Sequence, residues 1–260
     1  MTKLEKLKAD LRGLGELAVA FSGGADSSLL LRAAHDALGE RAIGITIRSP
    51  YMSSREIAEA VEFARAYGIR HEILELGVAE EIKDNPENRC YLCKKAVFSR
   101  LIERARELGF SRVADGTNRD DLGEYRPGLK AKEELGVLSP LINLTKSEIR
   151  ELSRELGLPT AEKPSYACLL TRLPHGREIE PGELNLIEAA ENLLIASGYA
   201  NVRARCDRKN IKLQMPFSSM RNFLNDAKFK SVVRQLVTLG AAEVTLDLKG
   251  LREDVLHERG

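Results

Sequence analysis

The alternation of short apolar runs with helical stretches over the first two thirds of the chain is the feature that most constrains the fold. The runs with the length and composition of buried strands are Leu17–Phe21, Ala42–Ile47, His71–Leu76 and 112–114. The stretches with helical periodicity that lie between them are 27–38, 53–67 and 91–108. Strands and helices that alternate at this length predict an α/β fold, an open parallel sheet with helices on both faces.

A second, smaller α/β domain is predicted from residue 181 onwards. A helical pattern over 181–198 comes first. It is followed by strand-like runs at Val202–Cys206 and Ile211–Met215, a helix over 220–239 and a last strand-like run at Glu243–Leu248. A segment of roughly 80 residues is long enough for a small domain. We therefore expect two domains, residues 1–180 and residues 181–260.

The charge balance and the spacing of charged residues exclude two classes of protein. The chain has 40 Lys and Arg against 39 Asp and Glu, whereas binding to nucleic acid through counterion release requires an excess of basic side chains. The overall charge therefore excludes a nucleic-acid binder dominated by electrostatics and argues against a nucleic-acid partner, while a local basic patch stays open. The longest stretches without a charged residue span only eleven residues, far short of the ~20 that cross a membrane. The N-terminal segment lacks an apolar signal core, so we expect a cytoplasmic protein without a membrane partner.

The heptapeptide SGGADSS stands between the first predicted strand and the first predicted helix. Its glycines allow a tight turn that brings backbone N–H groups against an anion, and the helix N-terminus adds partial positive charge. Serine hydroxyls can donate to phosphate oxygens, and a carboxylate fits beside phosphate when Mg²⁺ lies between them. The residues predicted to bind nucleotide phosphate are Ser22, Gly23, Gly24, Asp26, Ser27 and Ser28.

The heptapeptide lacks the endings of a Walker A loop and of a dinucleotide-binding turn. It resembles the pyrophosphate loop of the ATP pyrophosphatases, which implies that it holds departing pyrophosphate while an oxygen of the substrate is adenylated. Asp115-Gly116-Thr117-Asn118 resembles a second stretch that those enzymes place near the adenylate. Thr145 and Glu148 form a capping-box pattern, so Lys146 either belongs to a plain helix start or contacts phosphate.

Three of the four cysteines lie in or next to predicted long loops, at 77–90 and 160–180, and a third long loop is predicted at 117–130. Cys90 and Cys93 form a C-x-x-C pair, which is compatible with a redox pair, half a zinc site or chance. We expect both to converge with Cys168 at the carboxyl edge of the sheet. Three thiolates fit either zinc with His175 as fourth ligand or an iron–sulfur cluster with one open iron. Cys206 ends a predicted strand and is interpreted as buried structure.

These motifs, in their order along the chain, resemble the LarE family of sulfur-insertion proteins of nickel-pincer cofactor biosynthesis. The resemblance rests on SGGADSS, on NRCYLCK at 88–94, on PSYACLLTR at 164–172 and on the pair Arg203 and Arg205. It implies an adenine nucleotide alpha hydrolase-like fold, with ATP bound by 1–180 and with substrate binding and oligomerisation in 181–260. It also implies a homo-oligomer, commonly a hexamer.

The resemblance implies an enzyme that adenylates a carboxylate of pyridinium-3,5-biscarboxylic acid mononucleotide with ATP and Mg²⁺ and replaces carboxylate oxygen by sulfur. Family members with one cysteine sacrifice its sulfur, whereas members with three hold a [4Fe-4S] cluster that carries the sulfide. Because this chain has Cys90, Cys93 and Cys168, we expect the cluster route, with Cys168 and Asp26 as catalytic residues. The resemblance assigns the substrate phosphate to Arg203 and Arg205, near an acidic residue that Glu191 represents.

The residue that neutralises the α-phosphate stays open among Lys94, Arg172 and Lys146. Two other classes of function also stay open. A tRNA thiolase or another adenylating ligase with a pyrophosphate loop would share the ATP chemistry. A non-catalytic sensor of adenylate or metal would bind without releasing pyrophosphate.

Overall fold

A computed structural model of the chain describes residues 1–123 and 127–251. The chain forms two compact units, which are described separately below. The first comprises Met1–Ile82 and Glu87–Tyr166, and the second comprises Lys83–Pro86 and the chain from Ala167 onwards. The assignment of ATP binding to residues 1–180 and of substrate binding to residues 181–260 stays a prediction.

The first unit contains a four-stranded parallel sheet, as the sequence predicts, and its strand order is β3-β2-β1-β4. Its strands are β1 (Leu17–Ala20), β2 (Ala42–Arg48), β3 (Arg70–Glu75) and β4 (Val113–Ala114). Because all four strands are parallel, the turns that follow them lie at one edge of the sheet. This edge therefore receives the glycine turn after β1 and the Asp115 turn after β4.

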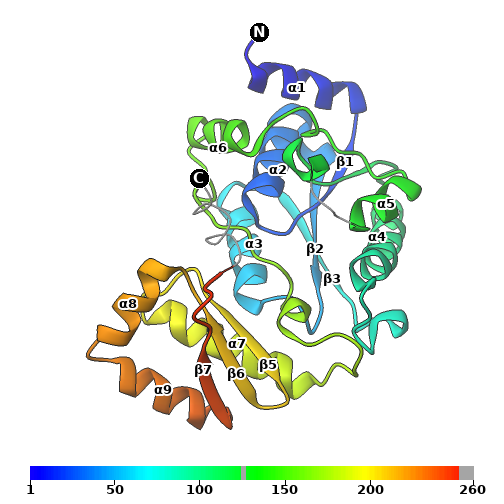
Figure 1. Ribbon diagram of the computed structural model, residues 1–260. Coiled ribbons are helices and arrows are strands. Elements are labelled where there is room, and N and C mark those ends of the chain that lie inside the picture. Colours follow the sequence, from blue (N-terminus) through cyan, green and yellow to red (C-terminus); the bar gives the residue numbers. More distant parts are fainter. Residues whose placement is uncertain (124–126, 252–260) are drawn as a thin grey trace. The chain divides into compact units, whose positions relative to one another are not determined.

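Helices cover both faces of this sheet (Figure 1). They are α1 (Lys3–Leu14), α2 (Ala25–Leu38), α3 (Ser54–Ala66), α4 (Arg89–Glu107), α5 (Pro127–Glu134) and α6 (Lys146–Glu155). Side chains of β1 alternate between the two faces. Leu17 and Val19 pack with residues of α1, α2, α3 and α6, whereas Ala18 packs with Leu101 and Ala105 of α4. The expectation of an open parallel sheet between two helical layers is confirmed.

The second unit has a three-stranded sheet in the order β5-β6-β7, in which β5 (Arg203–Asp207) is antiparallel to β6 (Asn210–Gln214). The third strand, β7 (Glu243–Leu246), is parallel to β6. Helix α7 (Pro181–Ala196) packs against β5. The small second α/β sheet agrees with the sequence prediction.

The single helix predicted over 220–239 is wrong. Two helices occupy this region, α8 (Phe217–Asn225) and α9 (Phe229–Thr238). Asp226 interrupts the helix in an extended conformation, and its carboxylate accepts hydrogen bonds from the Lys228 amide and the Tyr199 hydroxyl. The apolar pattern continues through this break because Phe223 and Phe229 pack against each other across it.

The predicted loops 77–90 and 117–130 contain more regular structure than expected. The first holds the short 3-10 helix Glu80–Ile82, and α4 begins at Arg89. The second holds the 3-10 helix Asp120–Gly123 and the start of α5, while residues 124–126 lie outside the described part. Among the helices of residues 1–123 and 127–251, none is long and apolar enough to span a membrane.

Candidate functional site

The glycine turn after β1 is held open by its own serines. Gly23 has φ +72°, a conformation that favours glycine, and a Cβ there would lie 3.1 Å from the Cβ of Ala60. The hydroxyls of Ser22 and Ser27 lie 3.1 Å apart, and Ser27 Oγ donates to the Gly24 carbonyl at 3.2 Å. Gly24 is the N-cap of α2 without a side-chain cap, so the first amides of this helix are available to an anion.

Two buried polar atoms in the first turn of α2, the Ser28 hydroxyl and Asp26 Oδ1, lack a hydrogen-bond partner among the described residues, although the Asp26 side chain as a whole is 24% exposed. Ser28 is 0% exposed. Asp26 Oδ2 lies 3.5 Å from Lys146 Nζ. Burial raises the pKa of Asp26, and the nearby Lys146 opposes that shift. Polar groups left unsatisfied in a turn of this kind are positions that a water molecule, an ion or a ligand can satisfy.

The Asp115 turn after β4 packs directly against the glycine turn. A Cβ on Gly116 would lie 2.9 Å from the Ser27 amide nitrogen and 3.0 Å from the Asp26 carbonyl carbon, so only glycine fits here. Asn118, two residues further on, is completely buried, and its Nδ2 has no partner in the described part of the chain. The two turns that the sequence singled out therefore form one polar site at the carboxyl edge of the sheet.

Lys146 lies at a capped helix start, as one of its two sequence interpretations predicts, and its contact with phosphate stays a prediction. Thr145 is the N-cap of α6 and forms the predicted capping box with Glu148. The Lys146 ammonium group lies at the glycine turn, where it faces Asp26 and donates to Ser165 Oγ at 2.9 Å. A plain helix start thus places a cation beside the phosphate loop.

Sequence reasoning missed two lysines of this region. Lys132 of α5 is buried and donates to Asp115 and Thr117. Lys163 donates to the Gly23 carbonyl at 2.9 Å and pairs with Glu59 at 2.6 Å. The helix-forming run Lys130–Leu135 could have indicated α5, but neither lysine belongs to a recognisable motif.

The prediction that puts Cys90 in the loop 77–90 is wrong. Cys90 lies in the first turn of α4, which begins at Arg89, and Cys93 follows one turn further along the same helix. Three-residue spacing on a helix brings both thiols to the same side. Cys90 is exposed, and Cys93 donates to the Tyr51 hydroxyl at 3.4 Å. Burial raises the pKa of Cys93, so the free thiol stays protonated unless a metal or cation stabilises the thiolate.

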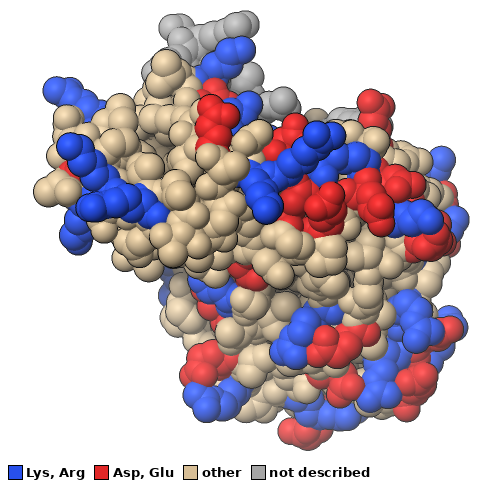
Figure 2. Space-filling view, turned by 90° about the horizontal axis from the view of Figure 1, so that it is seen from below, with Lys and Arg blue, Asp and Glu red and all other residues tan. Residues whose placement is uncertain are grey.

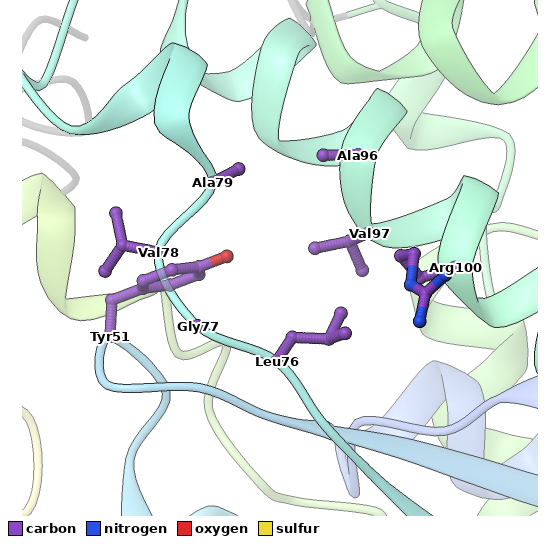
Figure 3. A pocket seen from close by; sticks show the side chains of 8 residues that line it. All are labelled: Tyr51, Leu76, Gly77, Val78, Ala79, Ala96, Val97 and Arg100. Carbon is purple, nitrogen blue, oxygen red and sulfur yellow. The ribbon is translucent and has the colours of Figure 1, made fainter.

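A pocket of about 200 Å³ lies next to this cysteine pair (Figure 3). It is lined by Tyr51 after β2, by Leu76–Ala79 after β3, and by Ala96, Val97 and Arg100 of α4. The lining is mainly apolar, and the Tyr51 hydroxyl connects it to Cys93. Lys94 extends over the ring of Phe98 on the same helix, 5.3 Å from its centroid.

In the second unit, a buried ion pair holds the turn that bears Cys168. Arg172 is 2% exposed and donates from Nε to Glu191 at 2.8 Å. The other end of its guanidinium group donates to the carbonyls of Ala167 and Cys168. Glu191 also accepts from the Ala204 amide of β5 at 2.9 Å. Arg172 is therefore engaged in fixing the Cys168 turn to α7 and β5.

The arginine pair lies on one face of β5, as predicted from its spacing. Ala204 and Cys206 are buried, while Arg203 and Arg205 are half-buried on the opposite face. Arg205 donates to Gln214 at 2.6 Å and to the Thr171 carbonyl at 3.0 Å, so it too contacts the Cys168 turn. Cys206 is buried structure, as expected, and burial beside Glu183 raises its pKa to about 12.

The metal-ligand prediction draws on both units, because Cys168 belongs to the second and the C-x-x-C pair to the first. Within residues 1–123 and 127–251, no three Cys, His, Asp or Glu side chains are grouped to hold a metal ion. His175, the candidate fourth zinc ligand, is exposed, and its Nδ1 lies 3.4 Å from the Pro86 carbonyl oxygen. Two thiols on one helical turn have the chemistry and spacing to bind one metal centre.

The fold and the joined turns define an α/β protein with a pyrophosphate loop. The chain is 34% identical over 264 residues to pyridinium-3,5-bisthiocarboxylic acid mononucleotide synthase from Lactiplantibacillus plantarum, with 99% of this chain and 94% of that protein covered. It is 37% identical to an uncharacterized protein from Synechocystis sp., with 98% and 97% of the two chains covered. The chain belongs to the LarE family of synthases and is an enzyme of that family. No family model matches it.

More distant similarity extends to other enzymes. The chain is 31% identical to the tRNA-specific 2-thiouridylase MnmA from Chlorobium luteolum, with 67% of this chain and 58% of that protein covered. It is 27% identical to a chain of the glutamine-hydrolyzing GMP synthase from Thermoplasma volcanium, with 62% of this chain and 58% of the relative covered. These matches cover only part of each protein.

Proposed function

We propose that the protein adenylates a carboxylate of pyridinium-3,5-biscarboxylic acid mononucleotide with ATP and Mg²⁺ and then replaces the activated oxygen by sulfur. The observation that carries the proposal is the junction of the two turns, in which Gly116 packs on Ser27 and Asp26. The unpartnered groups of Asp26, Ser28 and Asn118 lie in these turns. Membership of the LarE family supports the choice of substrate.

In the first step, a carboxylate oxygen of the substrate attacks the α-phosphorus of ATP, and the bond to the β-phosphate oxygen breaks. The backbone amides and serines of residues 22–28 would bind the departing pyrophosphate and stabilise the charge that develops on it. Asp26 would hold the Mg²⁺ that ATP brings. Lys146 has the strongest support as the cation that neutralises the α-phosphate, because it faces Asp26. Arg172 is already engaged in the ion pair with Glu191, and Lys94 remains a second candidate.

In the second step, a sulfur nucleophile attacks the acyl carbon, the bond from that carbon to the AMP oxygen breaks, and AMP leaves with the electron pair. Cys168 would hold or supply this sulfur, and Arg203 and Arg205 would bind the phosphate of the substrate. A [4Fe-4S] cluster, when bound, would supply a sulfide, and the residues that would hold it are Cys90, Cys93 and Cys168. Such a cluster would also keep Cys93 in the thiolate form that burial alone disfavours.

The experiment is incubation of the purified protein with ATP, Mg²⁺ and the pyridinium dicarboxylate mononucleotide, with pyrophosphate, AMP and the thiocarboxylate product measured separately. The wild type should form all three. Cys168→Ala should still release pyrophosphate but form no thiocarboxylate, because adenylation does not need the sulfur. A Cys168→Ala variant that inserts sulfur at the wild-type rate would show that the sulfur assignment is wrong.

Similarity to a tRNA thiouridylase favours one second candidate, thiolation of tRNA by the same ATP chemistry. The net charge of +1 argues against it, and at the upper right and the bottom of the face in Figure 2 basic and acidic side chains are intermingled, whereas its left side carries mainly basic ones. A gel shift with bulk tRNA at near-physiological salt separates the two functions. Binding of tRNA together with sulfur incorporation into it would favour the thiolase. A protein that releases no pyrophosphate with any carboxylic acid would instead be a sensor.

A homo-oligomer and a cytoplasmic location also stay predictions. Sedimentation velocity would test the expectation of a hexamer.

A further inference from the structure

Lys132 is a buried lysine that the chemistry proposed above does not use. Its side chain is about one tenth exposed, and its ammonium group donates to Asp115 Oδ2 and to Thr117 Oγ1. Lysine is almost never buried to this degree without a partner. Desolvation lowers the pKa of Lys132, while the carboxylate of Asp115 opposes the shift. Burying the Lys132 ammonium group therefore costs desolvation free energy, which its hydrogen bonds to Asp115 and Thr117 offset.

The partners of Lys132 flank the glycine that touches the phosphate loop. Asp115 and Thr117 lie on either side of Gly116. Asp115 also accepts from the Thr117 amide at 3.2 Å and from Ser139 Oγ at 3.1 Å. Besides the ammonium group, the Asp115 carboxylate therefore accepts from three donors, the Thr117 amide, the Thr117 hydroxyl and the Ser139 hydroxyl, and these bonds restrain the shape of the turn. A shift of this turn would move Gly116 into or away from the Ser27 amide.

The helix that bears Lys132 also lies against the start of α4, at Cys90 and Lys94. Helix α5 packs against α4. A Cβ on Gly128 would lie 2.9 Å from Lys94 Cγ and 3.5 Å from the Cys90 carbonyl oxygen, so this contact requires glycine. One short helix thus touches the C-x-x-C turn at its first turn and the Asp115 turn at its second.

From these contacts we infer that Lys132 is a positioning residue of the nucleotide site. Its ammonium group holds the Asp115 turn against the phosphate loop, and α5 sets the position of the C-x-x-C turn relative to that loop. The inference rests on the proposed function in taking residues 22–28 as the site of ATP. Lys132 does not contact the phosphates; it acts through Asp115 and Gly116.

Variants would behave differently if the Lys132–Asp115 ion pair only stabilised the fold and did not position the turn. Removing one partner of a buried pair leaves an uncompensated charge, whereas replacing both by neutral groups is often tolerated. If the pair serves only stability, neutralising both partners restores stability and ATP binding together. If it positions the turn, stability recovers and ATP binding does not.

The test uses the full chain with four proteins: wild type, Lys132→Met, the double variant Lys132→Met with Asp115→Asn, and Lys130→Met. Lys130 is an exposed lysine of the same helix, so its variant controls for loss of charge on α5. Stability is measured by urea unfolding, and affinity for ATP with Mg²⁺ is measured by isothermal titration calorimetry. The calorimetric readout requires no turnover.

We expect Lys132→Met to be less stable and to bind ATP at least about tenfold more weakly, because a charge-assisted hydrogen bond that shapes the site is lost. The double variant should regain stability toward the wild-type value and keep the weakened affinity. Lys130→Met should match the wild type in both. Wild-type affinity in the double variant, or in a folded Lys132→Met protein, overturns the inference.

If neither Lys132 variant folds, amide hydrogen exchange of the wild type, compared with and without ATP and Mg²⁺, tests the inference. Binding of ATP with Mg²⁺ should slow exchange at the amides of α5 as well as at those of residues 22–28. Unchanged exchange at α5 overturns the inference. A wild type that binds ATP but forms no AMP with the pyridinium substrate overturns the proposed function alone and leaves the role of Lys132 to be judged by affinity.

Discussion

Asp26 shows at the scale of one residue how the phosphate loop gives up stability for a binding site. Its carboxylate is largely withdrawn from water, one oxygen lacks a partner among the described residues, and burial raises its pKa. Lys146 at 3.5 Å compensates only in part. A cation bound with ATP would pair with the Asp26 carboxylate. Asp26 would then lower the folding stability of the protein without nucleotide and strengthen the binding of ATP.

Replacing Asp26 by Asn should therefore separate stability from activity. We expect AMP formation to fall about 100-fold or more, because the group proposed to bind the reacting phosphates through Mg²⁺ is lost. In the absence of nucleotide, Asp26→Asn should be more stable than the wild type near neutral pH. A steady-state assay of AMP and urea unfolding of both proteins measure the two effects. Asp10→Asn, an exposed site on α1, should change neither.

The sign of the pH dependence follows from the raised pKa of Asp26. The folded protein binds a proton at this carboxyl more tightly than the unfolded chain, so the wild type loses stability as pH rises from the ordinary value of 3.8 through the raised pKa. The Asn variant has no such loss. The advantage of the variant should thus be absent at low pH, grow through this interval and then stay constant. An advantage that shrinks as pH rises would contradict the assignment.

The buried pair Arg172–Glu191 should contribute far more to stability than an exposed pair of the same chemistry. Both side chains are at most 3% exposed, and Glu191→Gln would remove the carboxylate charge that faces the guanidinium group at 2.8 Å. We expect a loss of about 3–5 kcal/mol in the free energy of unfolding. Glu162→Gln, in the exposed pair with Arg154, should leave the urea midpoint close to that of the wild type. Equal midpoints for the two variants would contradict this account of the Cys168 turn.

At the scale of elements, the site depends on the close contact between the turns after β1 and β4. An added methyl group at Gly116 meets the backbone of Ser27 and Asp26, which cannot move without displacing the loop. Gly116→Ala should cost about 1–3 kcal/mol of stability and weaken ATP binding. Gly13→Ala on α1 meets nothing within 4 Å and should instead stabilise by about 0.5–1 kcal/mol. Urea unfolding and calorimetry with ATP test both variants.

The elements that could be predicted from sequence are those whose signal is local. Apolar runs gave β1 to β3, and the glycine turn between β1 and α2 was recognisable because its chemistry lies within seven residues. The contact of Gly116 with Ser27 spans about ninety positions and has no local signature. Lys132 was missed because burial of a charge depends on a partner elsewhere, here Asp115. The start of α4 was placed two residues late, which put Cys90 in a loop.

At the scale of the whole molecule, the predicted sulfur chemistry requires residues of both units. The C-x-x-C pair lies on α4 of the first unit, and Cys168 lies in the second unit at the N-cap of the 3-10 helix Leu169–Arg172. Each part is hydrogen-bonded within its own unit, Cys93 to the Tyr51 hydroxyl and the Cys168 carbonyl to Arg172.

Protein purified without oxygen should contain iron and acid-labile sulfide in equal amounts, with a charge-transfer absorption band that bleaches on reduction. Cys90→Ser and Cys168→Ser should each lose the iron, because a three-thiolate site needs ligands from both units. Cys206→Ser is the matched control and should keep it, since Cys206 is buried beside Glu183. The cluster should also raise the urea midpoint of the wild type, because a ligand that binds only the folded protein stabilises it. Protein that takes up zinc but never iron would contradict the cluster, and conversion of Cys168 to dehydroalanine during turnover would indicate a sacrificial thiol instead.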